Sequence, residues 1–163
     1  MKLLDIIEDD FVNYRVPSMT LEFPFCTFKC EKECGEPVCQ NHKLKNDIYY
    51  DYDIYDIIAA YDKDEISESI VFQGLEPLDS FDDVIDFIDK FRSNHIDDIV
   101  IYTGYTEDEV IGKGWYDKLA SYCNIVVKFG RFVPNSNSVE DSVLGVKLAS
   151  TNQYGKRISY IDI

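Results

Sequence analysis

The chain has 163 residues, of which 45% are hydrophobic, so it is long enough for one domain with a substantial apolar core. Its 16 basic and 31 acidic residues give a net charge of −15, which argues against nucleic acid and anionic membranes as partners. Acidic residues from Asp5 onward do not fit a signal peptide, and no apolar run approaches the roughly 20 residues that span a bilayer. We therefore expect a cytoplasmic protein with a single domain over residues 1–163.

Four short apolar stretches predict β-strands, and the last three are continuous runs of β-branched residues, as in buried parallel strands. Between them, apolar residues recur at helical spacing over 54–61 and 81–91. Two helix starts, at Ser80 and Thr106, have the spacing of a capping box. Strands that alternate with helices indicate an α/β protein with a mostly parallel sheet. The predicted strands are Met19–Phe25, Ile70–Phe72, Ile99–Tyr102 and Ile125–Val127.

Cysteines or glycine-containing turns follow each predicted strand. The first strand leads into the cysteines, the second into Gln73–Leu78, the third into Thr103–Thr106 and the fourth into Gly130–Phe132. Ligands of parallel α/β sheets bind at the carboxyl ends of the strands, so these segments are expected to form one site. Lys128, close to the end of the fourth strand, is predicted to face solvent.

Four of the five cysteines lie within 14 residues, as Cys26-x3-Cys30 and Cys34-x4-Cys39. Structural disulfides are rare in the cytoplasm, so this cluster favours a metal centre or redox chemistry. The spacing loosely satisfies a four-cysteine zinc site, although the usual two-residue separation is absent. Thiolates also bind iron–sulfur clusters, and three of them on a four-iron cluster leave one iron open to another ligand. On the cysteines alone, zinc and an iron–sulfur cluster both remain open.

Five segments, in order, resemble the radical S-adenosylmethionine (SAM) superfamily, and within it the activating proteins of anaerobic ribonucleotide reductase. Cys26–Cys30 matches the Cys-x3-Cys that opens the family's cluster motif. Gln73–Leu78 resembles its Gly-Gly-Glu-Pro turn, and Ile101–Thr106 is very similar to a segment of the reductase activators. Val127–Phe132 and Ala149–Gln153 resemble two later segments less closely. The resemblance therefore covers nearly the whole chain.

The third cluster ligand is where the chain departs from the family. The usual motif places a third cysteine two residues after the second, and this sequence has none there. Cys39 is the better match, because Gln40-Asn41 follows it and a short polar pair ending in Asn often follows the family's third cysteine. Glu31–Val38 then forms a looped insertion. The ligands that we expect are Cys26, Cys30 and Cys39, with Cys34 as the alternative third ligand.

The resemblance implies an incomplete (β/α) barrel of the radical SAM type that holds a [4Fe-4S] cluster and SAM. It implies reductive cleavage of SAM to generate a glycyl radical on a partner enzyme, the anaerobic ribonucleoside-triphosphate reductase. An electron donor such as a flavodoxin-like protein would supply the electron, and no catalytic residue beyond the cluster and SAM site is expected. The alternatives are a radical SAM enzyme with another substrate, or a zinc or iron–sulfur binding protein without SAM turnover. The residues implied to contact these cofactors are Asn41, Gly74, Glu76, Thr103 and Gly104.

Overall fold

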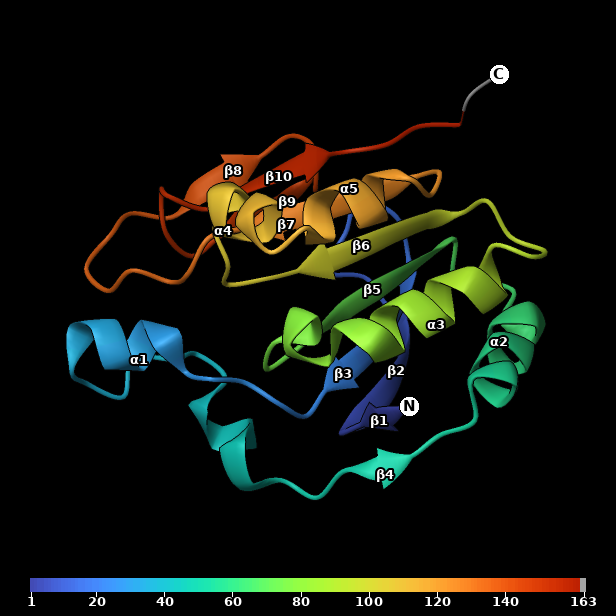
Figure 1. The fold of residues 1–163 in the computed structure, drawn as a ribbon, viewed down its shortest axis with the longest axis horizontal. Coiled ribbons are helices and arrows are strands. Elements are labelled where there is room, and N and C mark those ends of the chain that lie inside the picture. Colours follow the sequence, from blue (N-terminus) through green and yellow to red (C-terminus); the bar gives the residue numbers. More distant parts are fainter. Residues whose placement is uncertain (162–163) are drawn as a thin grey trace.

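The computed structural model describes residues 1–161 and has an open six-stranded sheet at its centre (Figure 1). The strand order is β10-β7-β6-β5-β3-β2, and the four central strands run parallel. All four predicted strands are confirmed, although the first ends before Phe25. The central strands are β3 (Ser18–Phe23), β5 (Ser69–Gly74), β6 (Asp98–Tyr102) and β7 (Ile125–Phe129).

Antiparallel strands form both edges of this sheet. β2 (Asp5–Asp10) pairs with β3, and β10 (Tyr154–Arg157) pairs with β7, so the sheet is mixed. Two small pairs accompany it, and both are antiparallel. They are β1 (Lys2–Leu3) with β4 (Tyr50–Asp51), and β8 (Val139–Asp141) with β9 (Val146–Leu148).

The prediction of an incomplete radical SAM-type (β/α) barrel with a mostly parallel sheet is wrong, although the α/β class is right. A barrel needs one strand–helix unit after another, each adding a parallel strand around the axis. Here the chain forms the β8–β9 hairpin after β7 and then returns as the antiparallel strand β10. The parallel series therefore stops at four strands, and the sheet stays open.

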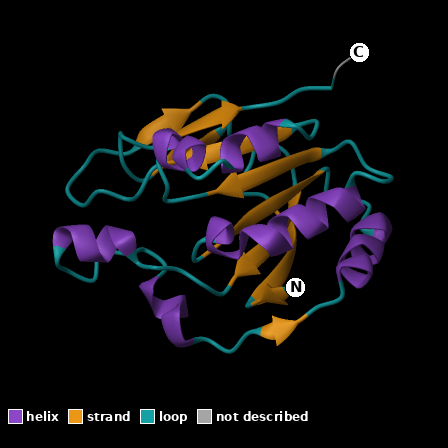
Figure 2. Ribbon diagram, viewed as in Figure 1, coloured by secondary structure: helices purple, strands orange, loops and turns teal. Residues whose placement is uncertain are grey.

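Helices cover one face of the sheet (Figures 1 and 2). Side chains alternate between the faces along each strand. Ile101 packs into the core beneath the helices, whereas its neighbour Val100 packs on the opposite face with Tyr14 and Leu148. Within residues 1–161, no helix combines the length and apolar character that crossing a membrane requires. The covering helices are α2 (Ile54–Lys63), α3 (Phe81–Phe91), α4 (Glu107–Gly112) and α5 (Trp115–Ala120).

Of the two predicted capping boxes, one is confirmed. The Thr106 hydroxyl accepts from the Glu109 amide, and the Glu109 carboxylate accepts from the Thr106 amide. The Ser80 side chain makes no cap hydrogen bond, because a short 3-10 helix, η2 (Pro77–Ser80), leads directly into α3. The confirmed cap lies at the turn after β6, where the site is found.

Candidate functional site

One cavity of about 510 Å³ lies at the carboxyl ends of the parallel strands. Loops after β3, β5, β6 and β7 form its wall, and Val146–Ala149 at the end of the β8–β9 hairpin lines it as well. The cavity thus brings together residues from segments far apart in the sequence. Eight predicted site residues line it: Cys26, Cys30, Cys39, Asn41, Gly74, Glu76, Thr103 and Gly104.

The three cysteines that line the cavity are partly buried thiols. Cys26 follows β3, Cys30 lies on α1 (Lys29–Cys34), and Cys39 lies five residues after α1. Burial raises the pKa of the Cys26 thiol to about 12. Burial, together with the nearby Cys39 thiol, raises the pKa of Cys30 to about 11. Both thiols are therefore protonated at neutral pH in the metal-free chain, and they lose their protons when they bind a metal.

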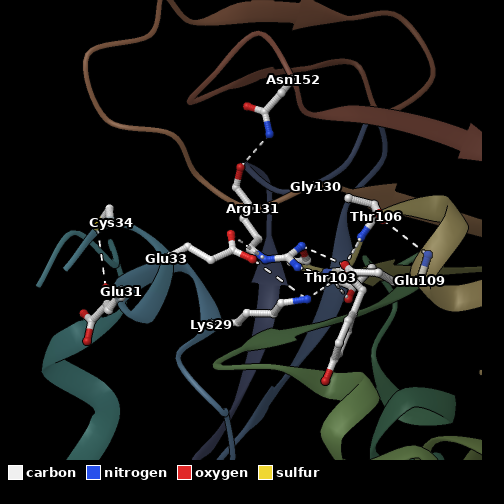
Figure 3. A network of polar contacts seen from close by, with 12 residues as sticks. Lys29, Glu31, Glu33, Cys34, Thr103, Thr106, Glu109, Gly130, Arg131 and Asn152 are labelled. Carbon is white, nitrogen blue, oxygen red and sulfur yellow. Dashed lines mark hydrogen bonds and ion pairs between the residues drawn. The ribbon is translucent and has the colours of Figure 1, made fainter. Parts of the chain in front are cut away.

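Cys34 does not belong to this set. It is exposed at the end of α1, and its thiol donates to backbone carbonyls of Glu31 and Glu36 at 3.7 and 3.4 Å. Figure 3 shows its contact with Glu31 apart from the polar network around Arg131. The preference for Cys39 over Cys34 as the third ligand is consistent with this placement and remains a prediction.

The segment between Cys30 and Cys39 is more regular than the predicted loop. Its first part is helical, and α1 ends at Cys34, where Gly35 caps it with a φ of +75°. The Glu31 carboxylate accepts a 3.3 Å hydrogen bond from the Cys39 amide and lies 2.6 Å from His42 Nδ1. Glu31 therefore holds Cys39 in place despite the long sequence separation between the second and third cysteines.

The donor set fits a multi-iron cluster better than a single ion. Among residues 1–161, no three His, Cys, Asp or Glu side chains converge to hold one metal ion. A structural zinc site needs four ligands around one point, whereas a four-iron cluster bonds each thiolate to a different iron. Three thiols that line one cavity, with Cys34 outside it, therefore suit a [4Fe-4S] cluster.

Glu76 joins the turns after β5 and β6. It is buried, and its carboxylate accepts hydrogen bonds from the Thr103 hydroxyl at 2.8 Å, the Gly104 amide at 2.8 Å and the Leu78 amide at 3.1 Å. Burial raises the pKa of Glu76 to about 7, although these hydrogen bonds oppose the shift. Both of its oxygens are used within the protein, so its main contribution is to hold the cavity floor together.

Gly74 is a glycine because β3 passes close to it. Its φ is +97°, and a Cβ there would lie 2.7 Å from the Phe23 nitrogen and 2.8 Å from the Phe23 oxygen. The Gly74 carbonyl accepts a 2.7 Å hydrogen bond from the Asn41 side chain. Asn41 therefore ties the segment after Cys39 to the end of β5, which places the cysteines beside the glycine turn.

Arg131 is the centre of a polar network that sequence reasoning missed (Figure 3). Its guanidinium donates to both carboxylate oxygens of Glu109, at 2.8 and 2.6 Å, and to the Gly104 carbonyl at 2.9 Å. Lys29 pairs with the same Glu109 carboxylate, and Glu33 lies 3.4 Å from Arg131 Nε. The network joins α1, which carries Cys30, to α4 and to the turn after β6.

Lys128 also lines the cavity, and the prediction that it faces solvent is wrong. Only 7% of the residue is exposed. A signal was present in the sequence, because Lys128 is the only charged residue within the otherwise apolar strand β7. A charge in a strand whose other side chains are buried is expected to have a specific reason.

Comparison with known proteins agrees with this site. Residues 18–153 match the model of the 4Fe-4S single cluster domain family, so the chain belongs to that family. It is therefore an iron–sulfur protein, as the sequence predicted, and the cysteines in the cavity carry thiols of the kind that such a cluster binds. Their assignment as its ligands remains a prediction. No curated protein and no solved structure matches the chain.

The raised pKa of Glu76 predicts an unusual dependence of stability on pH. The folded protein holds this proton up to about pH 7, whereas the unfolded chain releases it near the ordinary value of 4.5. Between these values the folded state binds more protons, so the free energy of unfolding decreases as pH rises, by about 3 kcal/mol. Urea unfolding at pH 5 and pH 7.5 measures this decrease, and Glu76→Gln should remove most of it.

Glu109→Gln is the matched control. Lys29, the Thr106 amide and Arg131 lower the pKa of Glu109 to about 2, so this carboxylate is ionised in the folded state at both pH values, and in the unfolded chain, near the ordinary value of 4.5, it is mostly ionised. This variant should therefore keep the wild-type decrease between pH 5 and 7.5. A Glu76→Gln variant with an unchanged decrease would contradict the assignment.

Proposed function

We propose that this iron–sulfur protein binds SAM in the cavity beside its cluster and cleaves it reductively. The observation that carries the proposal is the shared cavity. Three cysteines and all five residues that the radical SAM resemblance assigns to the cofactors line it, while the fourth cysteine of the group does not. Three thiolate ligands on a four-iron cluster leave one iron open to a small molecule. A volume of about 510 Å³ is in the range of small-molecule sites.

The chemistry is that of the bound groups. When bound, the cluster and SAM would together supply the one-electron cleavage of SAM to methionine and 5′-deoxyadenosine, with the electron from an external reductant and the hydrogen atom from a donor molecule. The residues of this chain hold the cluster and SAM and orient them relative to each other. Cys26, Cys30 and Cys39 bind the cluster, and Asn41 sets the position of the Gly74 carbonyl through its 2.7 Å hydrogen bond.

The remaining cavity residues keep the floor rigid. Thr103 and Gly104 are held by the buried Glu76 carboxylate, so the turn after β6 has one defined position. Arg131 closes the gap between this turn and α1. These contacts fix the turn after β6 relative to α1, so the lining beside Cys30 has a defined position.

The hydrogen-atom donor that we propose is a glycine of a partner enzyme, the anaerobic ribonucleoside-triphosphate reductase, which would then carry a glycyl radical, and a flavodoxin-like protein would be the electron donor. The identity of both partners rests on the resemblance. The net charge of −15 favours docking to a basic surface, with association that slows as salt is added.

A second candidate is an iron–sulfur protein without SAM turnover. The observation in its favour is the separation of Cys30 and Cys39, since a helical segment stands where the family has two residues. Cleavage of SAM distinguishes the two candidates directly.

The test is an anaerobic incubation of the reduced, cluster-loaded protein with SAM and the reductase encoded in the same genome. Formation of 5′-deoxyadenosine together with a glycyl-radical signal in electron paramagnetic resonance supports the full proposal. Cleavage of SAM without that signal contradicts the partner and keeps the SAM chemistry. No cleavage, with cluster and reductant confirmed, favours the second candidate.

A further inference from the structure

Lys128 is a buried cation that forms no ion pair with the described residues. Its side chain points from the end of β7 into the cavity wall, and its ammonium donates to the Gly130 carbonyl at 2.8 Å. The ring of Tyr102 lies 5.9 Å away. Among residues 1–161, no carboxylate lies within ion-pair distance of this ammonium, although an ammonium has three protons to donate.

Such a group is costly for a protein to keep. Burial disfavours the charged form and lowers the pKa of Lys128 to about 8, with Glu76 acting in the opposite direction. At neutral pH the side chain is therefore still mostly an ammonium, held in a place where water does not reach it freely. A buried charge of this kind is normally paired, so an anion is the partner that it lacks.

The charges around the cavity point to the same partner. The lining contains four basic side chains and one acidic side chain, Glu76, whereas the whole chain has 31 acidic and 16 basic residues. Lys29 and Arg131 are already paired with Glu109, and Lys147 is exposed. Lys128 is thus the buried basic residue of the cavity that remains available to a ligand.

We propose that Lys128 binds a carboxylate group of a ligand held in this cavity. One ammonium balances one negative charge, and the apolar side chains of Val146 and Leu148 line the same cavity. The carboxylate belongs either to the methionine part of SAM, in which case this inference rests on the proposed function, or to a second ligand. In both cases the group that binds the Lys128 ammonium is a carboxylate, and binding measurements with different ligands distinguish the two sources.

The experiment is isothermal titration calorimetry on the anaerobically purified, cluster-loaded protein. The probes are two pairs that differ in the acid group: SAM with decarboxylated SAM, and butyrate with butyramide. The variants are Lys128→Met, which keeps the length and removes the charge, and Lys128→Arg, which keeps the charge. Lys147→Met is the matched control, because it removes an exposed lysine from the same cavity.

If the methionine carboxylate is the partner, Lys128→Met weakens SAM binding at least tenfold and leaves decarboxylated SAM unchanged. If a second ligand supplies it, SAM binding is unchanged and the preference for butyrate over butyramide is lost. In either case the affinity of Lys128→Arg for the acid probes stays within about threefold of the wild-type affinity, and Lys147→Met binds all four probes as the wild type does. Removal of a buried charge is expected to preserve or raise the melting temperature, so loss of binding is separable from unfolding.

Unchanged affinities in Lys128→Met for all four probes overturn the inference, as does an equal loss in Lys147→Met. Wild-type protein that binds neither acid more tightly than its neutral counterpart also overturns it. The proposed function fails separately, when the wild-type protein binds no SAM, because the butyrate pair still decides the role of Lys128.

Discussion

Replacing Cys26, Cys30 or Cys39 by alanine is expected to abolish iron binding, whereas Cys34→Ala keeps it. The first three thiols line one cavity, and Cys34 is exposed outside it. A site with two thiolates has too few ligands for a four-iron cluster with one open iron, so the loss should be near complete for each variant. Iron and sulfide analysis with visible absorption spectra, after anaerobic purification, measures the result.

Cys34→Ala is the matched control, because it removes a thiol from the same short segment without touching the cavity. The opposite pattern, in which Cys34→Ala loses the cluster and Cys39→Ala retains it, would falsify the assignment of the third ligand. It would also show that α1 rearranges when the cluster binds.

Gly74→Ala is expected to destabilise the fold by about 2 to 6 kcal/mol. The added Cβ would lie within 2.8 Å of two backbone atoms of Phe23, and the φ of +97° is strained for any residue with a side chain. Backbone strain and overpacking each cost about 1 to 3 kcal/mol. The free energy of unfolding in urea measures the effect.

Gly104→Ala is the control for this variant. A Cβ at Gly104 would meet Glu76 at 3.4 Å and Arg131 at 3.5 Å, which is ordinary contact, so stability should change little. Equal stability of the two variants would contradict the explanation. At Gly74 the position of a side chain is occupied by strand β3, whereas the Gly74 carbonyl binds the Asn41 side chain. A loss of stability in Gly74→Ala therefore reports the lack of space beside β3.

The central strands and most of the site could be predicted from the sequence because both depend on local patterns. Runs such as Ile99–Tyr102 are too apolar for anything but a buried strand, and parallel strands end at one edge. That rule alone was enough to gather residues as distant as Cys26 and Gly104 into one site.

The edges of the sheet were not predictable in the same way. β2 (Asp5–Asp10) contains four acidic residues and pairs with β3 alone, so its sequence lacks the apolar alternation of a strand. β8, β9 and β10 are three or four residues long, which is too short for periodicity to register. β2 and β10 form the antiparallel edges that make the sheet mixed, and the β8–β9 hairpin interrupts the parallel series. The resemblance to barrel proteins did not predict any of these strands.

Lys128 and Arg131 were missed for a related reason. The ion pairs of Arg131 depend on which carboxylates face it in the folded chain. The sequence signal at Lys128, a single charge in an apolar strand, does not say which cavity the side chain lines. The helix at Cys30 was also unexpected, because Lys29–Cys34 is short and carries no buried side chain from which a pattern could be read.

The lack of buried side chains in α1 extends to the residues that follow it and affects how the metal-free protein opens. Along Lys29–Asp53, all of which the structure describes, no side chain is buried, so polar contacts rather than apolar packing hold this stretch. Partly exposed ion pairs such as Lys29 with Glu109 contribute little, and the stretch can open while the sheet stays folded. Backbone amides there should exchange with deuterated solvent orders of magnitude faster than those of β6, and bound iron should slow them. We therefore expect cluster assembly to need only a local opening of this stretch, without global unfolding of the chain.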